Sequence, residues 1–199
     1  MRLVLASASP ARLKTLRAAG LDPEVLVSGV DESQVTEADP AVLATELATR
    51  KARTVAAGIQ DAWVVGCDSV LEIDGQVHGK PSDPESARRR WLTMRGRSGV
   101  LHTGHCVIDT GSGREVVRAA RTVVRFAAVT DAEIDAYVAT GEPLEVAGAF
   151  TIDGLGGAFI DGVEGDPHTV VGISLPLLRR MLADLGVCWT NLWSPSVRG

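Results

Sequence analysis

Apolar residues recur along the chain at two spacings, one typical of strands and one typical of amphipathic helices. Short apolar runs at residues 3–6 and 24–28 predict two strands, and the run WVVGCDSVLEI predicts a third. Alternation from residue 116 to 128, after the turn TGSG, predicts a long hairpin with the segment VLHTGHCVID. Strands separated by helices pair in parallel and hairpins pair antiparallel, so we expect an α/β fold with a mixed, twisted β-sheet flanked by helices.

Helix-start signals lie between these strands. They occur at Ser9-Pro10, at Asp39-Pro40, at Asp83-Pro84 and, as a capping box with Glu133, at Thr130. The helix after Pro84 places Ala87, Trp91 and Met94 on one face, so the three arginines at 88–90 are expected in solvent. The final helix is expected to end at Gly186.

Length and charge limit the kind of protein this is. A chain of 199 residues that is 45% hydrophobic can bury a core, and we predict one domain over residues 1–199, with a core at 1–186 and a tail at 187–199. A net charge of −5 argues against stable binding to nucleic acid. No signal-peptide pattern and no long apolar run is found, which predicts a cytoplasmic protein that does not enter the membrane. The three cysteines, Cys67, Cys106 and Cys188, are expected to be reduced and buried.

The first strand runs directly into the sequence ASASPAR, which begins a helix. Unpaired N–H groups of the first helical turn, the hydroxyls of Ser7 and Ser9 and the guanidinium of Arg12 then point to one place. This arrangement predicts an anion site. Taken alone, the stretch also fits an ordinary capped helix that binds nothing.

Two charged residues lie among apolar neighbours. Lys51 falls in the middle of the apolar face of the second helix, so it either extends to the rim or points at a negative group inside the protein. Asp68 lies within VVGCDSVL, where an ionised carboxylate needs a partner, a hydrogen bond or a metal. It is either a structural cap or part of a catalytic cleft. A methionine at position 51 is expected to weaken substrate handling more than stability, because it suits the apolar face.

Further candidates belong with these residues. Asp31 and Glu32, in VDES, can join Asp68 in holding a divalent cation through carboxylate oxygens, and Lys80 lies in the rigid sequence GKP. Hydrolysis of a phosphoanhydride requires positive charge near the phosphates and a carboxylate near the attacking water. Arg12, Lys51 and Lys80 can supply the first, and Glu32 and Asp68 can supply the second. The glycine-rich tract at 148–172 either lets backbone approach a flat ligand or forms a tight turn.

The chain resembles the Maf family of nucleotide pyrophosphatases, through LASASPAR, VDES, RKAR, GCDSVL, GKP, TGEPLEVAGAF, IDGLGG and GDPHTVVGISLPLL. The resemblance implies a Maf/ITPase-like fold with two lobes around a central cleft. It implies hydrolysis of a nucleoside triphosphate between its α and β phosphates with Mg²⁺ or Mn²⁺, in a housecleaning role on pyrimidine or modified nucleotides, and a homodimer. The roles it implies are proton acceptor for Asp68, metal-side carboxylate for Glu32, and phosphate binding for Ser7, Arg12, Lys51 and Lys80. We therefore expect Asp68, Lys51 and Lys80 to be catalytic and Glu32 and Asp68 to hold the metal. Substrate contacts are expected from Ser7, Ser9, Arg12 and Ser69.

Four positions depart from the patterns of this family. Ala11 replaces the first of two arginines, Val146 and Asp153 replace a lysine and a glutamine of one branch, and Ser69 replaces a glutamine of another, so the preferred base is left open. A nucleotide-binding regulator of cell division with little turnover is the alternative, and it would not need Asp68 as a base. A dehydrogenase is disfavoured, because no glycine-rich turn follows the first strand.

Overall fold

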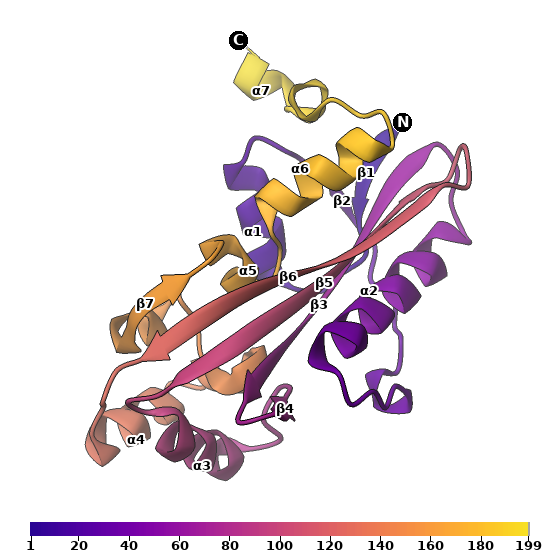
Figure 1. Cartoon of the computed structure of the whole chain (residues 1–199). Coiled ribbons are helices and arrows are strands. Elements are labelled where there is room, and N and C mark those ends of the chain that lie inside the picture. The colour runs from indigo at the N-terminus through magenta and orange to yellow at the C-terminus, as the bar shows by residue number, and fades with distance from the viewer. Residues whose placement is uncertain (199) are drawn as a thin grey trace. The chain divides into compact units, whose positions relative to one another are not determined.

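The computed structural model describes residues 1–198 of the chain (Figure 1). These residues form two compact units, each built from separate stretches of sequence. The first unit contains residues 1–68, 103–120 and those from 172 onwards, and the second contains residues 69–102 and 121–171. Three long strands contribute residues to both units: β3 (Ala62–Ile73), β5 (Ser98–Asp109) and β6 (Glu115–Phe126).

The strands form one mixed, seven-stranded sheet in the order β2-β1-β3-β5-β6-β7, with β4 beside β3. The shorter strands are β1 (Arg2–Leu5), β2 (Glu24–Val25), β4 (Gln76–His78) and β7 (Ile160–Glu164). β1 pairs in parallel with β2 and β3, whereas β4 pairs antiparallel with β3 and β7 pairs antiparallel with β6. The predicted α/β fold with a mixed sheet is thus confirmed, while the domain boundaries and the central cleft stay predictions.

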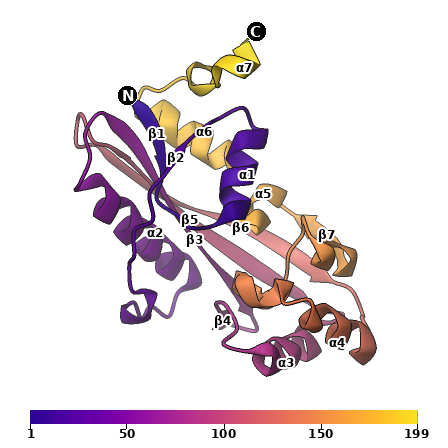
Figure 2. The same ribbon diagram turned by 180° about the vertical axis from the view of Figure 1, so that it is seen from behind.

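Helices cover both faces of the sheet in the first unit (Figure 2). Leu3 and Leu5 point towards α1 (Pro10–Ala18) and α6 (Leu175–Asp184), while the alternate residues Val4 and Ala6 point towards α2 (Pro40–Ala56). The helices begin at the predicted caps, Ser9 for α1 and Asp39 for α2. The unit also contains η1 (Glu32–Gln34), η5 (Trp189–Leu192) and α7 (Pro195–Arg198).

Two glycines allow α2 to lie unusually close to the sheet. A Cβ atom at Gly66 on β3 would lie 2.2 Å from the carbonyl oxygen of Ala48, and one at Gly104 on β5 would lie 2.1 Å from that of Ala44. Any side chain at either position would force the helix away from the strands. The residues of α2 that face the sheet, Lys51 among them, are therefore held at short range from β3.

The second strand is shorter than predicted. The expected strand covered residues 24–28, but β2 consists only of Glu24 and Val25. Its parallel partner β1 ends at Leu5, which lies opposite Val25, so no strand remains for the following residues to pair with. Val27 is accordingly exposed.

The second unit has an aromatic core. Trp91 on α3 (Pro84–Met94) makes edge-on contacts with Phe126, Tyr137 and Phe159. Tyr137 lies on α4 (Asp131–Ala139), which begins at the predicted capping box of Thr130 and Glu133. The remaining elements of this unit are η2 (Glu142–Glu145), η3 (Ala147–Ala149), η4 (Leu155–Phe159) and α5 (Pro167–Val171).

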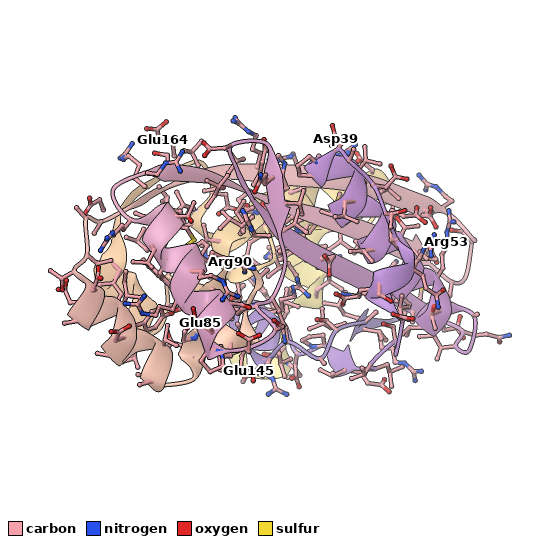
Figure 3. The ribbon with its side chains drawn as sticks, turned by 90° about the horizontal axis from the view of Figure 1, so that it is seen from below. Asp39, Arg53, Glu85, Arg90, Glu145 and Glu164 are labelled. Carbon is pink, nitrogen blue, oxygen red and sulfur yellow. The ribbon has the colours of Figure 1, made fainter. Side chains whose placement is uncertain are left out.

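The arginines of α3 are less free than the sequence predicted. Arg88 pairs with Asp135 of α4 at 2.6 Å, and Arg90 is half-buried and donates a hydrogen bond to the carbonyl oxygen of Gly79. Figure 3 labels Arg90 and Glu85 on α3, Arg53 on α2 and Asp39 at the N-cap of α2. The expectation that all three arginines face solvent is therefore wrong for Arg90, because a long guanidinium chain can reach back to a loop carbonyl.

Glycines of the tract at 148–172 serve close packing within the second unit. A Cβ atom at Gly156 would lie 2.4 Å from the hydroxyl oxygen of Tyr137, and one at Gly154 would lie 2.6 Å from a carboxylate oxygen of Glu142. Close packing alone therefore explains why glycine occupies these two positions, and no bound ligand is needed to explain it. Of the two predicted roles for the tract, the structural one is supported here.

The carboxylate of Glu142 holds this tract in place. Four groups donate hydrogen bonds to it: Tyr137 Oη, Thr151 Oγ1, Leu155 N and Gly156 N. Burial opposes ionisation of Glu142, but the bonds from Thr151 and the two N–H groups outweigh it and lower the pKa of the carboxyl group.

We expect Glu142→Gln to destabilise the protein by about 1–2 kcal/mol at pH 7, because one or more of these donors loses an acceptor. A folded-state pKa below that of the unfolded chain stabilises the protein at neutral pH, and this contribution is lost as the pH falls through the lowered value. The difference in melting temperature between wild type and the variant should therefore shrink below about pH 4. A constant difference from pH 7 to pH 3 would contradict the assigned role of the charge.

The cysteines differ in accessibility. Cys67 and Cys106 are buried, as expected, and burial raises the pKa of their thiols to about 11 and about 12. Cys188 is exposed, so the expectation that all three are buried is wrong for this residue. It precedes η5, where it caps the short helix and faces Thr190, whose hydrogen bond lowers the pKa of the thiol.

One thiol per chain is therefore expected to react rapidly with Ellman's reagent in the native protein, and three in denaturant. The thiolate is the reactive form, so the exposed group of lowered pKa reacts first. Cys188→Ser should remove the fast phase and leave the slow one. A fast phase that survives in this variant would assign the reactivity to Cys67 or Cys106 instead.

Candidate active site

The loop after β1 is organised around Ser7 and Ser9. The Oγ atom of Ser7 accepts a hydrogen bond from the backbone N–H of Ser9 at 3.2 Å, and the Oγ atom of Ser9 caps α1 by accepting from Arg12 N at 3.4 Å. Pro10 occupies the first turn, as predicted. Ser7 is buried, whereas Ser9 is partly buried and acts as a helix cap.

Arg12 is buried on the first turn of α1. Its Nη1 atom donates to Ser7 Oγ at 3.0 Å, and its Nε atom donates to the carbonyl oxygen of Gly172 at 2.7 Å. Two fixed acceptors thus hold the guanidinium. The predicted grouping of Ser7 and Arg12 at the end of the first strand is present in the structure.

Lys51 joins two carboxylates. Its Nζ atom lies 2.6 Å from Asp68 Oδ1 and 2.5 Å from Glu32 Oε1. The side chains of Lys51 and Asp68 are only 11% and 10% exposed, whereas that of Glu32 is 57% exposed. Of the two alternatives for Lys51, the structure supports the one in which the ammonium points at negative groups inside the protein.

The electrostatic environment of Asp68 is mixed. Burial raises the pKa of its carboxyl group, the charges of Lys51 and Arg12 lower it, and the charge of Glu32 raises it, with a net increase over the ordinary value. The influence of Arg12 on this pKa shows that the guanidinium and Asp68 share one electrostatic environment. A carboxyl group with a raised pKa is a better proton acceptor once it is ionised.

The parallel pairing of β1 explains this convergence. Leu5 lies opposite Val65 of β3 and Val25 of β2, so the residues that follow β1 and β2 leave the sheet beside the middle of β3, which continues to Ile73. Ser7, Glu32 and Asp68 all follow these paired positions. Asp68 lies two positions after Gly66 on β3, hence on the strand face that packs against α2 and Lys51.

Asp31 lies apart from this group, whereas Ser69 directly follows Asp68 in the chain. Asp31 is exposed and caps η1, where its carboxylate accepts hydrogen bonds from Ser33 and Gln34, so the expectation that it joins Asp68 is wrong. Ser69 follows Asp68 on β3, and the alternation of a strand directs its side chain to the opposite face.

Lys80 belongs to the second unit and is exposed. Its Nζ atom lies 3.8 Å from a carboxylate oxygen of Glu145, and both side chains are exposed. The preceding carbonyl, that of Gly79, accepts hydrogen bonds from Arg90 and from the N–H of Gly148. These bonds anchor the backbone of the residue before Lys80. Figure 3 labels Arg90 and Glu145.

The part of the chain that the structure describes contains no group of three or more His, Cys, Asp and Glu side chains arranged for a metal ion. Two carboxylate oxygens nevertheless converge on one point, the ammonium of Lys51. This number suits Mg²⁺, which is commonly bound by one or two carboxylates together with substrate phosphates and water. Glu32 and Asp68 thus fit a site that is completed by a substrate.

Sequence reasoning missed several residues of this region. Gly66 and Gly104 permit the close approach of α2, and an isolated glycine within a strand pattern is a signal for such an approach. Gly172, which accepts from Arg12, lies within the quoted stretch GDPHTVVGIS but carries no local sign of that contact. His105 also escaped notice as a functional candidate.

The fold and the site together define an α/β protein in which a helix N-terminus and a buried arginine follow the carboxyl end of a parallel strand, with an acid–lysine cluster on the neighbouring strand. Such an arrangement is typical of proteins that act on phosphorylated ligands. The chain belongs to the Maf family, because the family model described as Maf-like protein matches residues 2–185.

Curated relatives agree with this membership. The chain is 64% identical to a protein of Streptomyces coelicolor named nucleoside triphosphate pyrophosphatase, over 98% of this chain and 96% of that protein. It is 61% identical to one of Salinispora tropica with the same name, over 98% of this chain and 88% of that protein. Among solved structures, the Staphylococcus aureus Ham1 protein aligns with a TM-score of 0.49 and 13% identity, over 97% of this chain and 94% of that one, a likeness too weak to support an inference.

Proposed function

We propose that this protein hydrolyses nucleoside triphosphates at the α–β phosphoanhydride, releasing the nucleoside monophosphate and diphosphate. The observation that carries the proposal is the buried contact between Lys51 and Asp68, with Glu32 on the same ammonium and Arg12 acting on the same carboxylate. The relatives from Streptomyces and Salinispora, which share most of this sequence, are named for this class of enzyme.

Asp68 is the proposed general base. In the reaction, the oxygen of a water molecule forms a bond to a phosphorus atom of the anhydride, the bond from that phosphorus to the bridging oxygen breaks, and Asp68 takes the proton of the water. Its raised pKa favours proton uptake, and its short contact with Lys51 fixes the orientation of the carboxylate. Because Asp68 is buried, the proton that it takes up is also less readily lost to bulk water.

The cations and the helix end supply charge for the phosphates. Arg12 and the first turn of α1 present N–H groups at the same edge of the sheet, and we propose that they bind phosphate oxygens together with Ser7 and Ser9. Lys51 and Lys80 are proposed to stabilise the charge that develops on transferring and leaving oxygens. Ser69 is proposed as a further substrate contact.

A divalent cation, Mg²⁺ or Mn²⁺, is the proposed cofactor. Glu32 and Asp68 would hold it, and when bound it would neutralise negative charge on the phosphate groups. Because Glu32 is more than half exposed, its carboxylate can exchange its contact with Lys51 for another cation at small cost.

The substrate is proposed to be a free nucleotide in the cytoplasm, with a pyrimidine or modified base, and the protein to be a homodimer. None of the helices among residues 1–198 has the length and apolar character needed to cross a membrane. The departures at Ala11, Ser69, Val146 and Asp153 leave the identity of the base to experiment.

The deciding experiment is incubation with a panel of canonical and modified triphosphates and Mg²⁺, with separate assays for diphosphate and orthophosphate. Diphosphate and monophosphate in equal amounts are expected for at least one substrate, and chelation of the metal should stop their release. Orthophosphate alone would place the cleavage elsewhere. Tight nucleotide binding without product would favour the alternative, a regulator of division with little turnover.

A further inference from the structure

The segment Gly172–Ser174, between α5 and α6, meets the candidate site although it lies far from it in sequence. The carbonyl oxygen of Gly172 accepts a hydrogen bond from Arg12 Nε at 2.7 Å, across 160 residues of chain. Both ends of this contact belong to the first unit. The direction of that carbonyl therefore affects where the guanidinium points.

Glycine is needed at position 172 for two independent reasons. Its φ angle is +109°, a conformation that residues with a side chain rarely adopt. In addition, a Cβ atom there would lie 2.9 Å from Arg12 Nε and 3.3 Å from Arg12 Nη2. A side chain at this position would thus both strain the backbone and push the guanidinium away.

His105 on β5 fixes the other end of the segment. It is fully buried, its Nε2 atom lies 2.8 Å from the backbone N of Ser174, and its Nδ1 atom lies 3.0 Å from the carbonyl oxygen of Thr103. A backbone N–H can only donate, so Nε2 accepts, and Nδ1 carries the proton and donates to Thr103. The imidazole is accordingly neutral and has one defined tautomer.

The residues between these contacts have little freedom. Ile173 is fully buried in the apolar core of the first unit, and Ser174 caps α6 by accepting from Leu177 N at 3.2 Å. With Ser174 held from both its backbone and its side chain, the segment is anchored directly after the carbonyl of Gly172, which points in one observed direction. That direction is towards Arg12.

We propose that Gly172 and His105 are positioning residues, which hold the guanidinium of Arg12 in the orientation that binds phosphate. The proposal deepens the proposed function, and it rests on that function only for its kinetic consequences. The position of Arg12 itself is a property of the protein without substrate. The two parts can therefore be tested separately.

The first test measures hydrogen exchange of the Arg12 Nε–H group by NMR in the substrate-free protein, with Arg12→Lys used to assign the signal. Gly172→Ala is expected to accelerate this exchange at least tenfold. The matched control is Gly186→Ala, because Gly186 also has a positive φ, +83°, but has no atom within 4 Å of an added Cβ. If the Arg12 Nε–H group exchanged at the same rate in Gly172→Ala and Gly186→Ala, the proposal would be overturned.

The second test separates positioning from a purely structural role of His105. His105→Leu leaves the N–H of Ser174 without an acceptor, whereas the amide oxygen of His105→Gln can take the place of Nε2. We expect the Arg12 Nε–H group to exchange faster in the leucine variant than in wild type. In the glutamine variant we expect its exchange rate to return to the wild-type value. A loss of melting temperature with unchanged Arg12 exchange in the leucine variant would overturn the role of His105. Should the leucine variant not fold, wild-type Arg12 exchange in the glutamine variant supports the role, and accelerated exchange there overturns it.

The kinetic test is a double-variant comparison on a triphosphate that the wild type cleaves. Gly172→Ala should lower kcat/KM about tenfold in the wild-type background and have almost no further effect in an Arg12→Ala background. An equal loss in both backgrounds would show that Gly172 acts by another route. If the wild type cleaves no triphosphate, the proposed function fails, while the exchange measurement still decides whether Arg12 is positioned in this way.

Discussion

Asp68→Asn is expected to lower kcat by about 10²–10⁴-fold, because an amide cannot take the proton from the attacking water. Nucleotide binding should persist, since Lys51 remains beside Glu32 and Arg12 keeps its contacts with Ser7 and Gly172. The measurements are single-turnover hydrolysis and nucleotide affinity by calorimetry. Removal of one negative charge from the site can even strengthen the binding of an anionic ligand.

The matched control for this prediction is Asp22→Asn. Asp22 makes an exposed ion pair with Arg17, so the same chemical change there should leave activity unaltered and stability within about 1 kcal/mol. A kcat for the Asp68 variant within threefold of wild type would remove this residue from the role of base. An inactive variant that also fails to bind nucleotide would point to a binding role instead.

Lys51→Met is expected to reduce kcat/KM by at least about 10²-fold and also to destabilise the protein by about 3 kcal/mol. The second effect differs from the expectation based on sequence alone, in which methionine suited the apolar face of the helix. The structure shows that the ammonium is the ion-pair partner of the buried Asp68, so its removal leaves that carboxylate uncompensated. Protonation of Asp68 limits the loss.

The double variant Lys51→Met, Asp68→Asn tests this explanation by chemical denaturation. Its stability should recover most of what the single Lys51 variant loses, because no buried charge is left, while activity stays absent. Lys14→Met, on the exposed face of α1, is the control for loss of a lysine charge. Additive losses of stability in the double variant would show that Lys51 stabilises the fold independently of Asp68.

Local signals in the sequence predicted most of the elements correctly. The caps at Ser9, Asp39, Asp83 and Thr130 all begin helices, because each cap depends on hydrogen bonds within a few residues. The length of β2 was not predictable in this way, since it is set by where its partner β1 ends.

The candidate site was predictable to the extent that its residues are chemically out of place. A lysine on an apolar helix face and an aspartate within an apolar strand each need a partner, and the structure shows that they are partners of one another. The same reasoning could not distinguish Glu32 from its neighbour Asp31, because both follow the same strand and only the local turn decides which one faces Lys51.

The sequence by itself determined most of the strands and helices, the charge that disfavours nucleic acid, and the family to which the chain belongs. Only the tertiary structure decided that Gly66 and Gly104 bring α2 against the sheet, that His105 fixes Ser174, and that the carbonyl of Gly172 holds Arg12. The reason is physical. Periodicity and capping act over a few residues, whereas the hydrogen bonds of His105 and Gly172 join residues 69 and 160 positions apart, and such pairings exist only once the sheet has formed.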